Sequence, residues 1–153
     1  MSDHRGVRDR ALRLLAMRAH GVAELKQKLL AKGEPADEVQ RVVTECLEQG
    51  FLNDTLFACH RTVSRIAGKG YGPHKVKGEL LALGLDPEDV ARGMARALSE
   101  IDLEAVVAKV LAKRCAEINR EGVAAARQRA RKKCIDLLYR RGFDRDTIYR
   151  ILS

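Results

Sequence analysis

The sequence has few residues that break helices and few aromatic side chains. Three prolines occur among its 153 residues, tryptophan is absent, and aromatic residues make up 4% of the chain. Strict alternation of polar and apolar residues, which marks a half-buried strand, is hard to find. The apolar residues, 46% of the total, are mainly Leu, Val, Ala and Ile, which suit interdigitating helices. These features predict an all-α protein.

Long apolar segments are also absent. A membrane-spanning helix needs roughly 20 consecutive apolar residues, and no run approaches that length. Near the N-terminus the stretch ALRLLAMRAH is interrupted by arginines, unlike the apolar segment of a signal peptide. We therefore expect a cytoplasmic protein that makes no membrane contact. We also expect it to act as a monomer.

Metal-binding and catalytic patterns are missing as well. The four cysteines, at positions 46, 59, 115 and 134, form no Cys-x-x-Cys pair, and the four histidines complete no zinc spacing. No Ser or Cys has a partnered His at an interpretable spacing, and the acidic residues cluster at predicted helix starts, where capping explains them. We expect buried thiols in a reducing compartment, no metal, no cofactor and no enzymatic activity.

The charge is unevenly distributed along the chain. Lys and Arg total 29 against 21 Asp and Glu, a formal net charge of +8. Residues 1–52 carry 9 bases and 8 acids, a net +1, and residues 53–100 carry 7 and 6, again +1. Residues 101–153 carry 13 bases and 7 acids, a net +6. Such a balance favours an anionic partner, and it predicts that the C-terminal third contacts it.

Three glycines are surrounded by similar residues. The segments read LKQKLLAKGEPADEV around Gly33, VKGELLALGLDPEDV around Gly84 and CIDLLYRRGFDRDTI around Gly142. Counted from each glycine, apolar residues recur at positions −8, −4 and +6, so the first two share one helix face. These residues are Leu25, Leu29 and Val39; Val76, Leu80 and Val90; and Cys134, Leu138 and Ile148.

The pattern predicts helix pairs joined by a glycine in the left-handed conformation, followed by a capped acidic helix start. A further helix precedes each pair, expected over Arg8–His20, Asp54–Ala67 and Leu103–Asn119. The first should bury Leu12, Leu15 and Ala16, and the second Phe57, Val63 and Ile66. We therefore predict three tandem three-helix repeats, at 8–53, 54–100 and 101–153, that form an elongated, curved helical solenoid.

The stretch KGYGPHKVKGELLALGLDPEDV, residues 69–90, contains two of the predicted helix starts. Pro73 should occupy the first turn of one helix, and Asp86 with Pro87 should begin the next. A phosphate loop is not expected here, because no Gly-Lys-Ser/Thr follows the glycines and no predicted strand precedes them. Tyr71 suits packing at the joint, a surface anchor or base stacking.

Three segments together resemble the RecX family. EQGFLNDTLFA at 48–58 and GKGYGPHKVKGELLALG at 68–84 are similar to that family's two signatures, and the stretch at 11–33 also fits. The resemblance covers about residues 8–98, and the third repeat matches more by architecture than by motif. The chain departs from the family pattern at three places: His-Gly-Val at 20–22, where a basic residue and Ser are expected, Glu34, where an aromatic residue is usual, and an extra basic tract in the last repeat. The first two should affect local packing only, whereas the third leaves open how far DNA contact, rather than protein contact, dominates.

The resemblance implies a small cytoplasmic regulator rather than an enzyme. RecX-like proteins bind the RecA recombinase, commonly within the groove of its filament on DNA. They modulate, and mostly inhibit, its ATPase, strand-exchange and co-protease activities in the control of DNA repair and the SOS response. We therefore expect RecA as partner and non-specific contact with single- or double-stranded DNA.

The basic residues divide into two candidate contact surfaces. The densest stretch is ARQRARKKC at 126–134, and a second group follows the FLND motif. A solvated helix face is the simpler explanation for each. The candidate partner-binding residues are Arg61, Arg65, Lys69, Lys75, Lys77, Arg127, Arg129, Arg131, Lys132, Lys133, Arg140 and Arg141. Near the last of these, Tyr139 and Tyr149 suit either stacking on a nucleic-acid strand or helix packing.

The remaining candidates are structural. Asn53 or Asp54 should cap the helix that carries Phe57, and Phe51, Leu52 and Phe57 should pack at the joint between the first two repeats. Gly33, Gly84 and Gly142 should end helices. Two other functions stay open: a DNA-binding module of helix-turn-helix-like units, and a helical scaffold for another acidic protein.

Overall fold

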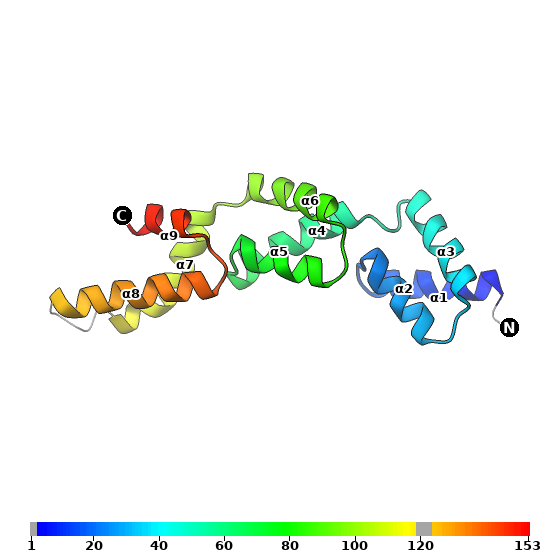
Figure 1. Ribbon diagram of the computed structural model, residues 1–153, viewed down its shortest axis with the longest axis horizontal. Coiled ribbons are helices and arrows are strands. Elements are labelled where there is room, and N and C mark those ends of the chain that lie inside the picture. Colours follow the sequence, from blue (N-terminus) through cyan, green and yellow to red (C-terminus); the bar gives the residue numbers. More distant parts are fainter. Residues whose placement is uncertain (1–2, 119–123) are drawn as a thin grey trace. The chain divides into compact units, whose positions relative to one another are not determined.

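The computed structural model describes residues 3–118 and 124–153, apart from the side chains at 114–118, 125 and 126. Within these ranges the chain is helical and contains no strand (Figure 1), so the all-α prediction is confirmed. The helices are α1 His4–Met17, α2 Val22–Ala31, α3 Ala36–Glu48, α4 Asp54–Val63, α5 Pro73–Ala82, α6 Pro87–Glu100, α7 Leu103–Ile118, α8 Ala124–Arg140 and α9 Arg145–Leu152. The predicted end of the seventh helix at Asn119 lies outside the described residues.

The chain forms two compact units. One comprises Met1–Cys59 with Leu80–Gly93, and the other comprises His60–Glu79 with Met94–Ser153. In the first, α1, α2 and α3 pack against one another (blue to cyan in Figure 1). In the second, α8 packs against both α7 and α9. The division into three repeats at 8–53, 54–100 and 101–153 stays a prediction.

The three repeated glycines end α2, α5 and α8 in the same way. Gly33, Gly84 and Gly142 have φ angles of +82°, +84° and +94°, which side chains with a Cβ rarely adopt. Each glycine N–H donates to the carbonyl three residues earlier, at 2.9–3.0 Å, and the next N–H donates to the carbonyl five residues before it, at 3.1–3.4 Å. This is the Schellman motif, and it satisfies carbonyls that the helix end would leave unpaired.

The apolar residues around these glycines form the cores. All nine repeated positions are at most 8% exposed, and the leucine four residues before each glycine is completely buried. The three residues around Gly33 join Val7, Ala11, Val42 and Val43 in one core cluster. Leu138 and Ile148, around Gly142, join Val107 and Phe143 in another. Burying a leucine fully contributes about 1.5–3 kcal/mol, so the periodic pattern stabilises the units directly.

The first helix begins earlier than the sequence predicts. It starts at His4, because the Asp3 side chain accepts a hydrogen bond from the N–H of Gly6 at 2.8 Å and caps the helix. The buried face is then Val7 and Ala11, with Leu14 and Leu15 partly buried beside them. Of the three residues expected on this face, Leu15 packs against the core and Leu12 is partly buried. The expected burial of Ala16 is wrong, because its side chain is exposed.

The fourth helix continues into a π-helical turn, Ser64–Gly68. Its buried stripe is Ala58, Thr62 and Ile66, all completely buried, while Phe57 is 9% exposed. Val63 lies about 100° further round the helix than Thr62 and is 36% exposed, so its expected burial is wrong. The turn brings the chain to Gly70, which begins the joint with α5.

The FLND motif supplies two caps rather than one. The side chain of Asn53 accepts from the N–H of Leu56 at 3.0 Å and caps α4. Asp54 accepts instead from the N–H of Val22 at 3.0 Å, so it caps α2, whose own preceding residue offers no side-chain cap. Burial raises the pKa of the Asp54 carboxyl, and the negative charge of Asp89 adds to this effect. The hydrogen bond from Val22 lowers the same pKa but does not cancel the increase.

The two phenylalanines near this motif differ in burial. Leu52 and Phe57 are 2% and 9% exposed, as expected, but Phe51 is 52% exposed, so its predicted packing at the joint is wrong. The N–H groups of Phe51 and Leu52 both donate to the carbonyl of Cys46, at 2.8 and 3.1 Å. Adjacent side chains in this turn cannot both face the core, and Leu52 takes the inner position.

The start of α5 lies against the end of α8 within the second unit. The N–H of Gly72 donates to the carbonyl of Arg141 at 2.6 Å, and that of His74 donates to the carbonyl of Gly142 at 3.0 Å. A Cβ on Gly72 would lie 2.2 Å from the carbonyl carbon of Gly142, so only glycine allows this approach. Opposite ends of two helix dipoles therefore meet, which is favourable.

His20 and Glu34, which depart from the family pattern, are buried. His20 is 4% exposed; its Nδ1 lies 2.8 Å from the carbonyl of Arg18 and its Nε2 lies 3.0 Å from Nζ of Lys28. Glu34 occupies the position that Leu85 and Phe143 occupy after the other two glycines. Its side chain is 1% exposed and forms an ion pair with Arg10, while Oε2 has no hydrogen-bond partner among the described residues.

We expect Arg10→Met to lower the free energy of unfolding by about 2 kcal/mol, because it leaves the buried Glu34 carboxylate without its partner. The exposed Arg13 is the matched control, and Arg13→Met should change this free energy by less than about 0.5 kcal/mol. Replacing Glu34 by Leu should be neutral or stabilising by up to about 1 kcal/mol, since apolar groups fill the same position elsewhere. Urea unfolding followed by circular dichroism measures all three. Equal effects of the two arginine substitutions would contradict this account of Glu34.

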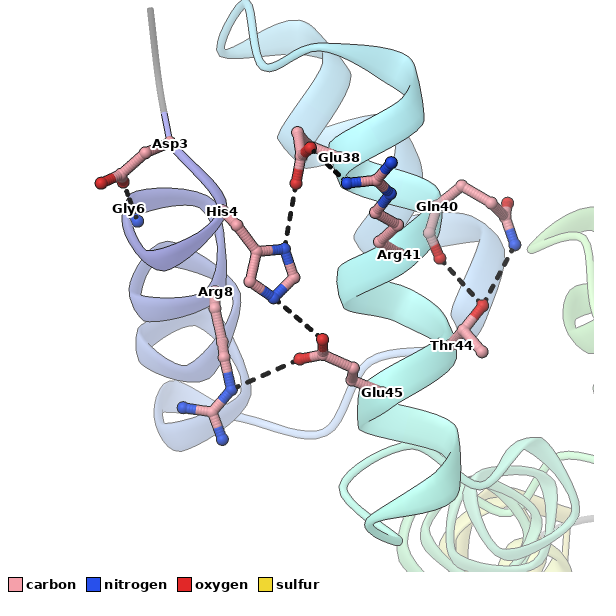
Figure 2. Close-up of polar contacts among 9 residues, drawn as sticks. All are labelled: Asp3, His4, Gly6, Arg8, Glu38, Gln40, Arg41, Thr44 and Glu45. Atoms are coloured by element: carbon pink, nitrogen blue, oxygen red, sulfur yellow. Dashed lines mark hydrogen bonds and ion pairs between the residues drawn. The ribbon is translucent and has the colours of Figure 1, made fainter.

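A polar cluster joins the start of α1 to α3 (Figure 2). His4 bridges two carboxylates, with Nδ1 3.0 Å from Glu38 and Nε2 2.9 Å from Glu45. Arg41 pairs with Glu38 at 3.1 Å, and Nε of Arg8 lies 3.6 Å from Glu45. The hydrogen bond to Glu38, with the charges of Glu45 and Glu38, raises the pKa of His4.

A raised pKa in the folded state means that protonated His4 stabilises the fold. This contribution is complete below the ordinary histidine pKa of about 6.5 and is lost as the pH rises through the raised folded value. We therefore expect His4→Gln to destabilise the protein more at about pH 5.5 than at about pH 8.5. Thermal unfolding of both proteins at the two pH values tests this. A difference between them that grows as the pH rises would be incompatible with the cluster.

Candidate functional site

The basic residues of α8 are exposed, and Nη2 of Arg131 donates to the carbonyl of Leu152 at 3.4 Å. Cys134 and Leu138 are 8% and 0% exposed, and Leu138 belongs to the core cluster of the second unit. The remaining surface, here named the α8 basic face, consists of Arg127, Arg129, Arg131, Lys132, Lys133 and Arg140, all exposed. Asp136 is the one acidic residue in the sequence of this helix. Long cationic side chains with little acid among them suit phosphates or an acidic protein surface.

A groove with an aromatic wall opens beside this face. It has a volume of about 540 Å³ and lies between α8 and α9. Tyr149, 40% exposed, forms part of its wall, and the guanidinium of Arg145 lies 5.5 Å from the tyrosine ring. The groove is lined by Gln128, Arg129, Arg131, Lys132, Ile135 and Tyr149. A cationic groove with an accessible ring is typical of single-stranded nucleic-acid binding.

Tyr139 lies elsewhere on α8 and is 68% exposed. This exposure excludes core packing for Tyr139, which was one of its two interpretations.

Tyr71 lies between two of the predicted contact residues. Nζ of Lys75 lies 4.1 Å from the centre of its ring and the guanidinium carbon of Arg65 lies 5.9 Å from it, which are cation–π distances. Nε of Arg65 also lies 3.1 Å from Oε2 of Glu79, an ion pair whose angle is not that of a hydrogen bond. Arg65 and Lys75 therefore already make contacts within the chain, and the partly buried Tyr71 lies between them.

The other candidates of this group are placed differently. Lys69 and Lys77 are exposed, whereas Arg61 is partly buried and its Nε has no hydrogen-bond partner in the part of the chain described. Nη1 of Arg141 donates to the carbonyls of Lys69 and Gly70, at 3.0 and 3.3 Å, so Arg141 holds the joint together. The structure thus separates the α8 basic face from residues that make contacts within the chain near the start of α5, namely Arg65, Lys75 and Arg141. Lys69 and Lys77 stay exposed and belong to neither group.

Two further exposed cations were not among the contact residues predicted from the sequence. Lys109 and Lys113 are four residues apart on α7 and both are exposed. They border a pocket together with Lys69 and Arg141. Their spacing in the sequence does indicate that they lie close together, because residues four apart share a helix face. Nothing in the sequence showed that this face meets the end of α8.

The cysteines and histidines form no metal centre within residues 3–118 and 124–153, where no three potential ligands gather. Cys46, Cys59 and Cys134 are buried and form no disulfide, as expected, and burial raises the pKa of Cys46. The side chain of Cys115 lies outside the described residues. None of the described helices has both the length and the hydrophobicity that crossing a bilayer requires.

Comparison with known proteins agrees with the helical architecture. Residues 8–46 match the family model described as RecX, first three-helix domain. A crystal structure of RecX from Lactobacillus salivarius superposes with a TM-score of 0.81 at 18% identity, covering 97% of this chain and 94% of that one. At this identity the likeness shows the fold alone.

Sequence relatives extend the match over nearly the whole chain. The regulatory protein RecX of Xanthomonas axonopodis pv. citri (strain 306) is 37% identical over 139 residues, which cover 91% of this chain and 81% of that protein. That of Stenotrophomonas maltophilia (strain R551-3) is 38% identical over 141 residues, covering 92% and 82%. The chain therefore belongs to the RecX family of regulatory proteins.

Proposed function

We propose that this protein binds the RecA recombinase and its filament on DNA, and that it mostly inhibits RecA's ATPase, strand-exchange and co-protease activities. It would act in this way in the control of DNA repair and the SOS response, without catalysing a reaction itself. The observation that carries the proposal is family membership at 37% identity over 91% of the chain.

The charge distribution supports an anionic partner of this kind. The C-terminal third holds +6 of the net +8, and the α8 basic face exposes six cations along one helix. A nucleoprotein filament offers phosphates and repeated protein surfaces together. Several weak contacts to neighbouring protomers would add through effective concentration, so modest individual contacts suffice.

The mechanism follows from binding across more than one protomer. RecA protomers must move relative to one another during ATP turnover, and a protein that contacts two of them would restrain that motion. Alternatively, the same contact would favour loss of subunits from the filament. Both routes lower ATP hydrolysis, and only the second shortens the filaments.

A titration of ATP hydrolysis by RecA on single-stranded DNA tests the proposal. Added protein should lower the rate at amounts below one molecule per RecA protomer, and electron microscopy of the same mixtures should separate restraint from shortening. Unchanged hydrolysis and unchanged filament length at excess protein would refute the proposed function.

A second candidate is non-specific DNA binding by this protein alone, which the groove between α8 and α9 favours. Tyr149 beside Arg129, Arg131 and Lys132 offers a base-stacking ring next to cations for the backbone. The affinity for a single-stranded oligonucleotide without RecA distinguishes the two functions. Binding that falls steeply with salt while RecA hydrolysis stays unchanged would favour this candidate.

A further inference from the structure

A pocket in the second unit combines an apolar floor with a cationic rim. Its volume is about 510 Å³, within the range of binding sites for small ligands and side chains. The floor includes Val106 and Leu137, which pack against the core of this unit. The rim carries Lys69, Lys109 and Lys113, all exposed, with the partly buried Arg141. None of the described residues that line the pocket is acidic.

The arrangement of the rim favours an anionic occupant. Lys109 and Lys113 share one face of α7, and like charges four residues apart destabilise a helix. Arg141 is fixed there by its hydrogen bonds to the carbonyls of Lys69 and Gly70. Several negative charges above the pocket would relieve the repulsion between these cations. A single phosphate would contact fewer of these cations than a peptide with several carboxylates would.

The floor favours an aliphatic or aromatic side chain over a nucleobase. Its described lining is built from Ala, Val, Leu and Gly, and it contains no aromatic ring on which a base could stack. Among the described residues it also offers no Asn, Gln, Ser or Thr side chain to bind the polar edge of a base. An apolar protein side chain needs neither and gains affinity from burial alone.

We propose that this pocket binds an acidic peptide segment, in which one apolar residue enters the pocket and flanking carboxylates pair with Lys69, Lys109, Lys113 and Arg141. The pocket involves α7 and the end of α8, apart from the α8 basic face. The proposal does not depend on the proposed function, because it concerns the peptide chemistry and not the identity of the partner.

Fluorescence anisotropy with the full-length protein and a labelled nonapeptide tests it. The peptide carries one central leucine flanked on each side by Asp and Glu, and a companion peptide carries alanine in its place. We expect the leucine peptide to bind about tenfold more tightly than the alanine peptide, because the apolar side chain is buried on binding. This preference should persist as salt weakens the affinity of both peptides.

Two variants and a matched control locate the binding. Lys109→Glu with Lys113→Glu should weaken binding of the leucine peptide at least about tenfold. Arg13→Glu with Arg96→Glu changes the net charge equally at exposed positions outside the pocket, and should weaken binding less than about threefold. Ala112→Trp fills the pocket without changing the charge, and should remove the preference for leucine. Circular dichroism confirms that each variant is folded.

Three results would overturn the proposal. The two peptides could bind alike, which would leave no role for the apolar floor. The two charge-reversed proteins could lose affinity equally, which would reduce the binding to net charge. Charge reversal at Lys109 and Lys113 could weaken binding of a single-stranded oligonucleotide and leave binding of the peptide unchanged. This result would make the pocket a nucleic-acid site. None of these measurements uses RecA, so their failure differs from failure of the proposed function.

Discussion

Replacing Gly72 by alanine should lower the free energy of unfolding by about 3 kcal/mol, the largest effect that we expect from a single methyl group in this chain. The added Cβ would lie 2.2 Å from the carbonyl carbon and 2.3 Å from the carbonyl oxygen of Gly142. These are backbone atoms at the end of α8, and they cannot rotate away as a flexible side chain would. Relief of the overlap would separate the start of α5 from α8 and break two hydrogen bonds.

The control is the same substitution six residues later, within α5. A Cβ on Gly78 would meet nothing within 4 Å, and its position is exposed and helical. Gly78→Ala should therefore raise the free energy of unfolding by about 0.5–1 kcal/mol, since alanine loses less backbone entropy on folding. Urea unfolding of both variants measures the contrast. Similar stabilities for the two would show that α5 and α8 do not meet as described.

Reversing three charges on the α8 basic face should weaken binding to single-stranded DNA about a hundredfold at low salt. The variant carries Arg127→Glu, Lys132→Glu and Lys133→Glu, at exposed positions on one helix. Each lost phosphate contact reduces the salt slope of the affinity by about 0.7, so three contacts reduce it by about 2. Fluorescence anisotropy with a labelled oligonucleotide at several salt concentrations gives both quantities.

The matched control reverses the same number of charges elsewhere. Arg5, Arg13 and Arg96 are exposed and lie on α1 and α6, and their replacement by Glu also changes the net charge from +8 to +2. This protein should keep most of its affinity and nearly the original salt slope. An affinity of the unmodified protein that does not vary with salt would rule out the α8 basic face as the contact.

The local features of this fold could be predicted from the sequence. All nine apolar positions around Gly33, Gly84 and Gly142 are buried, because a helix of 3.6 residues per turn and a left-handed glycine depend on residues close together in the chain. Pro73 and Pro87 begin helices for the same reason.

Features that depend on distant contacts could not be predicted. Asp54 caps a helix that begins 32 residues earlier, and no local pattern indicates which N–H it will meet. Arg141 binds carbonyls more than 70 residues away and so serves the joint, although its sequence neighbourhood resembles a contact surface. Phe51 is exposed because the turn after α3 directs Leu52, and not Phe51, toward the core. For the candidate site, sequence indicated the basic stretch of α8 but not the pocket that Lys109 and Lys113 border.

The most direct test of the central claim compares three proteins in one assay of ATP hydrolysis by RecA on single-stranded DNA. The quantity is the protein concentration that halves the rate, for the unmodified chain, the variant reversed on the α8 basic face and the control reversed at Arg5, Arg13 and Arg96. We predict that the half-inhibiting concentration of the variant reversed on the α8 basic face is at least about tenfold higher than that of the unmodified chain. For the control it should be less than about threefold higher. Equal inhibition by the two reversed proteins, or no inhibition by the unmodified chain, would contradict a regulator that acts through this face.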